Sequence, residues 1–316
     1  MRIVFLGTPD FAVGTLEALL DAGFNVSAVV TAPDRPAGRG QQLHQSAVKV
    51  FALSRGLKIM QPEKLKDPAF LSELAAEKAD LQIVVAFRML PVEVWNMPTM
   101  GTYNLHASLL PKYRGAAPIN WAVINGEKET GVTTFKLRHE IDSGNILLQE
   151  KVTIGENETA GELHDRLMET GAGLMVRSVK IVRDCFLAKT EPQFQEQEEK
   201  LVTHAPKIFR DTCRISWNDP PKKIHDLVRG LSPHPASFTT INKEVEQVVK
   251  IFRTSFDDFS HRHSNGTVLT DNRSWLKVCC EGGTIGILEL QMQGKKRMAV
   301  ADFLKGNKFT VSDRFI

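Results

Sequence analysis

Short apolar runs alternate with helical patterns in the first half of the chain. Residues 2–6 (RIVFL), 26–30 and 81–86 (LQIVVA) are mostly apolar runs of strand length, and residues 11–20 have apolar positions at helical spacing. Runs that are apolar throughout are typical of strands covered by helices on both faces. The pattern therefore predicts an α/β domain with a Rossmann-like, mostly parallel sheet. Its other expected elements are helices over 46–55 and 69–78 and strands over 57–60 and 131–137.

The pattern changes near residue 188. Residues 188–205 contain TEPQFQEQEEK, a polar and acidic stretch without apolar periodicity, which we expect to be a linker. An amphipathic helix around 224–231 follows, and then several short strand-like runs separated by turns such as Asn265-Gly266. Short strands with a helix are typical of a small β-barrel of the oligonucleotide-binding (OB) kind. We expect a first domain over 1–187, a linker over 188–205 and a β-barrel domain over 206–316.

Charge is distributed unevenly between these parts. The net charge is +3, but residues 206–316 hold 18 Lys and Arg against 12 Asp and Glu, so the remainder is net negative. A basic domain behind an acidic one suggests small-molecule chemistry in front and a polyanion such as a nucleic acid behind. Charge alone also fits a basic surface that is merely solvated.

Several classes of protein are disfavoured by missing patterns. The first turn, residues 7–11, lacks G-x-G-x-x-G, and no G-x-x-x-x-G-K-[ST] occurs, so we expect no NAD and no P-loop nucleotide. The four cysteines have no zinc-like spacing, so we expect reduced thiols and no metal. The first apolar run ends at Gly7, too short for a signal peptide, and no later run is long enough for a membrane span. We expect a cytoplasmic monomer that does not bind membranes.

The densest polar cluster surrounds Asn104 and His106. These residues are two apart, so on an extended segment they point to the same side. Asp142 lies on an Asp-Ser-Gly turn after the expected strand 131–137, from which it can reach the imidazole. An amide and a histidine can donate to a developing oxyanion, and an aspartate can orient the histidine or accept a proton from an amine. The set predicts acyl transfer to an amine, although each motif alone also fits ordinary strand-end and turn residues.

The chain resembles the methionyl-tRNA formyltransferase family in five segments that occur in the family's order. They are GTPDFA at 7–12, PDRPAGRG at 33–40, NLHASLLPKYRGAAPI at 104–119, TGV at 130–132 and IDSG at 141–144. The resemblance implies that the first domain is a formyltransferase domain and the β-barrel a tRNA-binding domain. It implies transfer of a formyl group from 10-formyltetrahydrofolate to the amino group of initiator methionyl-tRNA, for translation initiation.

The resemblance also implies roles for individual residues. Asn104, His106 and Asp142 would be catalytic, and Arg39, with Arg35 beside it, would contact tRNA from a loop suited to phosphate. Folate would be received by Ser108, Leu109, Leu110 and Pro111, with Phe87, Met89 and Leu90 bordering the pocket. The tail cations expected to contact RNA phosphates are Lys207, Arg210, Lys222 and Lys223. Arg88 departs from the Tyr-Gly pair of many relatives, and we expect it to point to solvent rather than pair with a folate carboxylate.

Two other functions remain open from the sequence. One is a formyltransferase for a nucleotide-sugar amine, or a formyl-folate hydrolase; the 33–40 loop and the basic tail argue against both. The other is an RNA-binding module on a catalytically inactive sheet, against which the intact set of Asn104, His106 and Asp142 argues.

Overall fold

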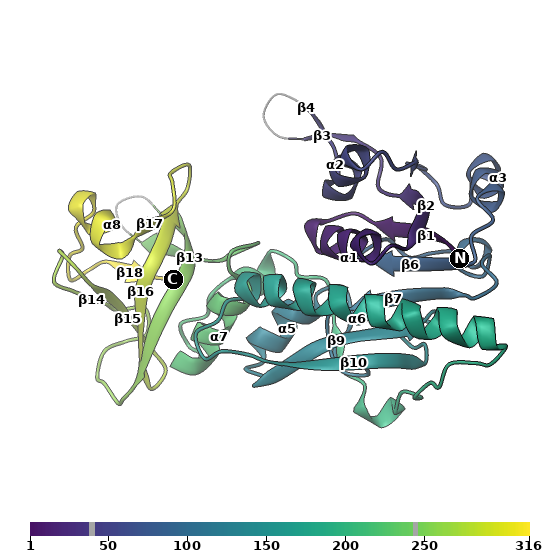
Figure 1. The fold of residues 1–316 in the computed structure, drawn as a ribbon. Coiled ribbons are helices and arrows are strands. Elements are labelled where there is room, and N and C mark those ends of the chain that lie inside the picture. Colours follow the sequence, from purple (N-terminus) through teal and green to yellow (C-terminus); the bar gives the residue numbers. More distant parts are fainter. Residues whose placement is uncertain (38–41, 243–245) are drawn as a thin grey trace. The chain divides into compact units, whose positions relative to one another are not determined.

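A computed structural model describes residues 1–37, 42–242 and 246–316 (Figure 1). These residues form two compact units. The first comprises Met1–Gly115, Thr130–Thr153 and His164–His204, and the second comprises Ala116–Glu129, Ile154–Leu163 and Ala205–Ile316. Two segments of the predicted first domain, 116–129 and 154–163, therefore belong to the second unit, which local sequence patterns did not indicate.

The first unit is built on a central sheet. Its strands are β1 (Arg2–Gly7), β2 (Asn25–Val30), β5 (Ile59–Met60), β6 (Leu81–Val85), β7 (Thr102–His106), β9 (Glu129–Lys136) and β10 (Ile146–Thr153), in the order β10-β9-β7-β6-β1-β2-β5. β1 is parallel to β2 and β6, and β6 is parallel to β7, whereas β9 is antiparallel to β7. The mostly parallel, Rossmann-like sheet predicted from the sequence is confirmed.

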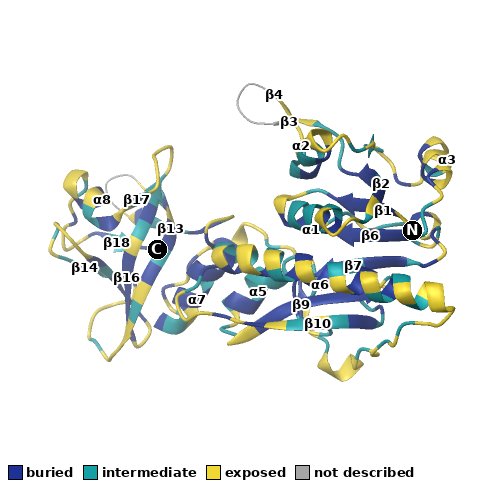
Figure 2. Ribbon diagram, viewed as in Figure 1, coloured by how far each residue is buried: buried dark blue, intermediate teal, exposed yellow. Residues whose placement is uncertain are grey.

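Helices cover both faces of this sheet. They are α1 (Asp10–Asp21), α2 (Ala47–Ser54), α3 (Pro68–Ala76), α4 (Val92–Trp95) and α6 (Ala160–Ala188). On one face, Val4 and Leu6 of β1 share a cluster with Phe70 and Leu74 of α3. On the other, a Cβ added to Gly7 would lie 2.6 Å from the Cβ of Ala12 in α1, so only glycine fits there. Covering on both faces explains why β6 is buried throughout (Figure 2).

The segment expected to be a linker is folded against the first unit. Gln195 forms an antiparallel bridge with Ile146, and the Phe194 ring stacks on Tyr103 with ring centroids 6.4 Å apart. Further along are a short 3₁₀ turn, Glu199–Leu201, and strand β11 (His204–Ala205). Despite its acidic composition, this segment is therefore ordered, and its main chain is hydrogen-bonded to the first unit.

The second unit is a nearly closed antiparallel barrel, as predicted. Its strands are β12 (Ser237–Asn242), β13 (Gln247–Asp258), β14 (Val268–Thr270), β15 (Leu276–Cys280), β16 (Gly283–Met292), β17 (Met298–Ala299) and β18 (Arg314–Phe315). They follow the order β14-β15-β16-β13-β12-β18, with β17 beside β16. A bridge between Thr267 and Arg314 joins the two ends of this path. The closure leaves little free strand edge.

Helices α5 (Pro118–Ile124), α7 (Pro221–Leu231) and α8 (Val300–Gly306) complete the second unit. Asn120 of α5 donates from its side chain to the carbonyl of Gly230 at 2.7 Å. A Cβ on Gly230 would lie 2.5 Å from Cγ1 of Ile124, so the two helices are in close contact. The buried Arg229 pairs with Asp226 and also donates to the carbonyl of Glu158. These contacts explain why segments 116–129 and 154–163 belong to the barrel unit.

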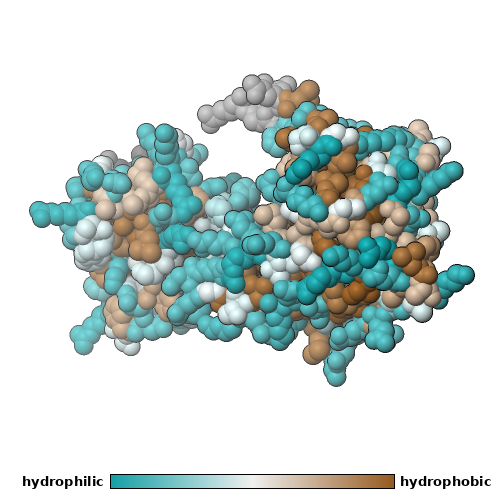
Figure 3. All heavy atoms as spheres, in the orientation of Figure 1, coloured by the Kyte–Doolittle hydropathy of each residue, from teal (hydrophilic) through white to brown (hydrophobic). Residues whose placement is uncertain are grey.

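The surface in the view of Figure 3 is mostly hydrophilic and is interrupted by separate hydrophobic patches. Among the described residues, no helix is both long enough and apolar enough to cross a bilayer.

Candidate active site

Asn104 and His106 lie at the carboxyl end of β7 and point to the same side, as their spacing predicted. Leu105 between them faces α6, where Gly171 has no room for a Cβ beside the leucine. Thr134, which pairs with Leu105 across the sheet, is bonded to Ser178 of α6. By alternation, Asn104 and His106 lie on the opposite face. His106 is 6% exposed, whereas Asn104 is half-buried and its side-chain amide has no hydrogen-bond partner among the described residues.

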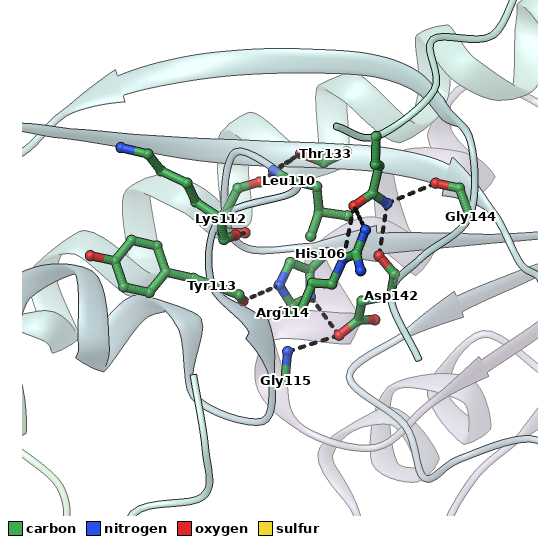
Figure 4. Close-up of polar contacts among 11 residues, drawn as sticks. His106, Leu110, Lys112, Tyr113, Arg114, Gly115, Thr133, Asp142 and Gly144 are labelled. Carbon is green, nitrogen blue, oxygen red and sulfur yellow. Dashed lines mark hydrogen bonds and ion pairs between the residues drawn. The ribbon is translucent and has the colours of Figure 1, made fainter. Parts of the chain in front are cut away.

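The ring of His106 is held by the main chain (Figure 4). Its Nε2 is 2.8 Å from the carbonyl oxygen of Tyr113. Because a carbonyl only accepts, Nε2 must carry the hydrogen of this bond. The other ring nitrogen, Nδ1, is 3.8 Å from Oδ2 of Asp142, which is an ion-pair distance and too long for a hydrogen bond. The structure brings Asp142 to the imidazole, but the Tyr113 carbonyl fixes the direction of the ring.

Asp142 itself is tightly placed. Its φ of 51° lies in the left-handed region that residues other than glycine rarely adopt. The main-chain N–H of Gly115 donates to its Oδ2 at 2.9 Å, and only 9% of the residue is exposed. Tyr113 also has a positive φ, of 61°. Unfavourable backbone conformations of this kind persist only where surrounding contacts hold them, and they cluster at functional sites.

The predicted folate wall is divided by the structure into buried and accessible residues. Ser108 and Leu110 are buried, and Ser108 donates to the carbonyl of Lys112 at 2.6 Å. The Leu110 N–H donates to Thr133 Oγ1, and its carbonyl accepts from Gln149. Ser108 and Leu110 therefore support the loop from within. Of the four predicted wall residues, only Leu109 and Pro111 are half-buried.

The segment after β6 borders the same end of the sheet. It begins with Ala86, whose φ is 45°, and Phe87 and Leu90 pack half-buried against the core cluster around β1 and β6. Met89 is 69% exposed. The expectation that Arg88 points to solvent is wrong. Its guanidinium donates to the carbonyls of Pro62 and Glu63, and partial burial lowers its pKa.

The predicted RNA-contacting cations fall into separate groups. Arg35 is exposed on β3 (Arg35–Ala37), which pairs with β4 (Gln42–His44), and Arg39 lies outside the described residues. Lys207 and Arg210 are exposed beside the rings of Phe209 and Phe238, respectively. Lys222 and Lys223 form ion pairs with Asp226 and Asp219.

Two glycines of the sequence motifs have a steric explanation. A Cβ on Gly131 would lie 2.1 Å from the carbonyl oxygen of Glu150, and one on Gly144 would lie 1.8 Å from that of Lys136. Real Cβ atoms do not approach this closely. Gly144 therefore allows the loop that carries Asp142 to return against β9, and Gly131 allows β9 to lie close to Glu150 of β10.

Replacing Gly144 with alanine should destabilise the protein strongly, because its Cβ would overlap the main chain of a strand that cannot easily move. We expect a melting temperature lower by about 5 °C or more. Gly173→Ala is the matched control, since nothing lies within 4 Å of a Cβ on this helical glycine. Alanine is the better helix former, so the control should be neutral or stabilising. Equal melting temperatures for the two variants would contradict the steric explanation.

Comparisons with known proteins identify the family. The family model described as Formyl transferase matches residues 1–179, and the one described as Formyl transferase, C-terminal domain, matches residues 207–308. A methionyl-tRNA formyltransferase of Parabacteroides distasonis is 52% identical over 98% of this chain and 96% of its own length. A methionyl-tRNA formyltransferase of Bacteroides thetaiotaomicron is 50% identical over 100% of this chain and 98% of its own length. This chain belongs to the methionyl-tRNA formyltransferase family. The resemblance stated from the sequence is confirmed, and the chain is a formyl-transferring enzyme.

Solved structures of more distant proteins share the fold. An N-formyltransferase from Helicobacter canadensis, in complex with folinic acid and dTDP-3-aminofucose, has a TM-score of 0.67 at 20% identity, covering 92% of this chain and 99% of that one. HypX from Aquifex aeolicus, in complex with tetrahydrofolic acid, has a TM-score of 0.64 at 19% identity, covering 98% of this chain and 48% of that one. At 19–20% identity this likeness shows the fold alone. The sequence identity with the methionyl-tRNA formyltransferases, 50–52%, is far higher.

Sequence reasoning missed several groups that shape the site. Tyr113, Arg114 and Gly115 were part of a recognised motif but had no expected role, because their contribution is made by main-chain atoms or by distant contacts. Gln197 lies in the supposed linker, and its side chain donates to the carbonyls of Asp142 and Gly144. No local pattern singles out one glutamine in a stretch of glutamine and glutamate.

Proposed function

We propose that this enzyme transfers a formyl group from 10-formyltetrahydrofolate to the amino group of initiator methionyl-tRNA. The observation that carries the proposal is the meeting of His106, Asp142 and an unengaged Asn104 at the carboxyl end of the sheet. Ligands of open parallel sheets bind at this end. Identities near 50% with methionyl-tRNA formyltransferases, against 18–20% with sugar N-formyltransferases, favour the tRNA amine over an amino sugar.

Each of the three polar side chains has a role that its contacts permit. The free amide of Asn104 donates to the formyl oxygen as negative charge develops there. His106, held through Nε2, supplies positive charge beside that oxygen when it is protonated. Oδ2 of Asp142 is engaged by Gly115, whereas its Oδ1 has no donor among the described residues. Oδ1 is therefore available to accept the proton that the attacking amine must lose.

The folate cosubstrate supplies the activated formyl group. Its binding is supported by the solved complexes of the related Helicobacter canadensis N-formyltransferase with folinic acid and of HypX with tetrahydrofolic acid. In this chain, half-buried Phe87 and Leu90 offer apolar surface for a ring system beside the polar set, and exposed Met89 adjoins them. Leu109 and Pro111 are the accessible members of the loop on the other side.

A direct test compares possible amine acceptors. The purified protein is incubated with 10-formyltetrahydrofolate and, in separate reactions, with initiator methionyl-tRNA, free methionine or an amino-sugar nucleotide, and formylated products are measured by mass spectrometry. We expect formylation of methionyl-tRNA alone. Preferential formylation of the sugar, or release of formate without an acceptor, would replace this proposal with one of the alternative enzymes.

We also propose that the barrel unit contacts RNA. The ion pairs indicate which of its cations are most available to bind phosphate. Lys207 and Arg210 make no ion pair among the described residues, whereas Lys223 is paired with Asp219. We expect Lys207→Ala and Arg210→Ala each to weaken tRNA binding several-fold and to reduce the slope of log K against log salt by about 0.9. The control, Lys223→Ala, should change both much less. Titrations of tRNA binding between about 50 and 200 mM salt measure both quantities. Equal effects in all three variants would contradict the ranking.

We also infer that the enzyme works in the cytoplasm as a monomer. The inference on the compartment is supported by four unpaired cysteines, of which Cys279 and Cys280 are adjacent and fully buried. Burial raises the pKa of Cys280 to about 12, so this thiol stays protonated. Light scattering of the purified protein tests the oligomeric state, and a mass of twice 35.3 kDa would contradict a monomer.

A further inference from the structure

The segment 195–203 is attached to both loops of the candidate site. At one end, the main-chain N–H and carbonyl of Gln195 pair with Ile146 at 2.9 and 2.8 Å. At the other, the Thr203 carbonyl accepts from the N–H of Arg114, and its hydroxyl oxygen accepts from the N–H of Tyr113, both at 2.9 Å. The segment therefore connects the loop that carries Asp142 with the stretch whose carbonyl holds His106.

Gln197 makes the central contact of this connection. Its Nε2 donates to the carbonyl oxygens of Asp142 at 2.7 Å and Gly144 at 2.8 Å. Its Oε1 accepts from Nε of Arg114 at 3.0 Å and from Nη2 at 2.8 Å. Carbonyls only accept and a guanidinium only donates, so the amide has a single orientation that satisfies all four bonds. The residues that these bonds connect, Arg114, Asp142 and Gly144, lie close together with Gly115 in Figure 4.

The position of this amide matters because the Asp142 backbone is in an unfavourable conformation. A φ of 51° at a residue with a Cβ is unfavourable and needs neighbouring contacts to persist. Gln197 binds the carbonyl of that residue directly. It also binds the side chain of Arg114, and the next residue, Gly115, donates to Oδ2 of Asp142. The Gln197 side chain thus restrains both the backbone of Asp142 and the short strand β8 (Arg114–Gly115), whose Gly115 N–H holds the carboxylate.

We propose that Gln197 is a positioning residue for formyl transfer: its side-chain amide holds the Asp142 carboxylate beside His106 by joining the Asp142–Gly144 loop to Arg114. The proposal rests on the proposed role of Asp142 as the group that accepts the amine's proton. Misplacement of a reacting group by about 1 Å costs on the order of 10²-fold in rate. Releasing this loop therefore lowers kcat while leaving the surfaces that bind folate and tRNA in place.

The first test replaces Gln197 with glutamate. Gln197→Glu keeps the length of the side chain and an acceptor for Arg114, but it turns the two N–H donors into an oxygen facing two carbonyls. We expect kcat for methionyl-tRNA formylation to fall about 30- to 100-fold, with the KM of each substrate changing less than about threefold. Gln195→Glu is the matched control, because Gln195 is exposed and holds the same segment through its main chain. It should keep wild-type kinetics.

A double-mutant cycle separates positioning from general destabilisation. If Gln197 acts through Asp142, then Gln197→Glu should cost less than about threefold in an Asp142→Asn background, measured in single-turnover reactions with excess enzyme. An equal loss in both backgrounds would overturn the proposal. Because the new carboxylate faces two carbonyls, Gln197→Met, which is similar in length and uncharged, is measured in parallel. Failure of both variants to fold would show a purely structural role and would also overturn it.

The same measurements distinguish failure of the proposed function from failure of the proposed roles of Asp142 and Gln197. If the wild-type protein formylates no methionyl-tRNA, the proposed function fails. If Asp142→Asn is fully active, the role of Asp142 fails. If Asp142→Asn is impaired and Gln197→Glu has wild-type kcat, only the inference about Gln197 fails.

Discussion

Replacing His106 with alanine should lower kcat for formyl transfer by about 10³-fold and leave tRNA binding largely unchanged. The imidazole lies on the same face of β7 as the unengaged amide of Asn104, where we propose that charge develops on the formyl oxygen. One lost donor of this kind costs roughly 10²–10³ in kcat, and His106→Ala also removes the ring nitrogen that lies 3.8 Å from Oδ2 of Asp142. Since the barrel unit is untouched, binding of tRNA should persist.

Two further variants test whether the loss of activity is caused by removal of the His106 imidazole itself. His106→Gln can still donate an N–H to the Tyr113 carbonyl, so it tests loss of the ring without loss of that hydrogen bond. It should be as inactive as His106→Ala but closer to the wild type in melting temperature. His139→Ala is the control, because His139 is an exposed histidine on the turn that leads to Asp142. Turnover of His106→Ala within tenfold of this control would remove the imidazole from the mechanism.

Replacing Asp142 with asparagine should lower kcat by about 10²–10³-fold with little change in stability. The asparagine oxygen can still accept from the Gly115 N–H, so the loop keeps its side-chain contact. Asparagine cannot accept the amine's proton, and general-base catalysis typically contributes 10²–10⁴-fold. The loss should therefore appear in kcat at saturating folate and methionyl-tRNA, measured by pre-steady-state formylation.

Asp142→Asn has its own control on the same turn. Ser143→Ala removes only a hydroxyl that donates to the carbonyl of Glu140 on the exposed side of the loop. It should retain kcat within about threefold. If Asp142→Asn behaved like Ser143→Ala, the carboxylate would have no part in proton transfer, and the 3.8 Å approach to His106 would be incidental.

The structure also changes how the two-domain organisation should be tested. The sequence suggested that residues 206–316 could be removed as a unit. However, Trp121 donates to the carbonyl of Pro206, and Asn120 donates to that of Gly230. Truncation would strip α5 of its partner α7 and expose apolar surface. Point substitutions of Lys207 and Arg210 are therefore a cleaner probe of RNA binding than deletion.

Parts of the fold follow from short stretches of sequence because their causes are local. Unbroken apolar runs at β1 and β6 require covering on both faces, so the parallel sheet was predictable. The two-residue spacing of Asn104 and His106 fixes their common side by strand alternation alone. The position of Asp142 on a turn after β9 was also expected. Its left-handed backbone was not, because that conformation depends on contacts around it.

Other expectations failed or were missing because they depend on contacts across the chain. Arg88 was expected in solvent, but its guanidinium donates to the carbonyls of Pro62 and Glu63, which lie 26 and 25 residues earlier in the chain. Nothing in the polar segment 188–205 indicates that it would fold back onto the loops of the candidate site. A hydropathy pattern records which residues avoid water, and a main-chain hydrogen bond to a distant segment leaves no trace in it.

The sequence by itself determined the class of each unit and the place of the polar site, and it predicted the chemistry of Asn104, His106 and Asp142, since periodicity and residue type are local properties. Only the tertiary structure decided what holds these groups: the Tyr113 carbonyl on the imidazole, the Gly115 N–H on the carboxylate, and the Gln197 amide 55 residues beyond Asp142. Such partners are selected by how the whole chain packs, because every buried donor and acceptor must find its counterpart wherever the fold places one.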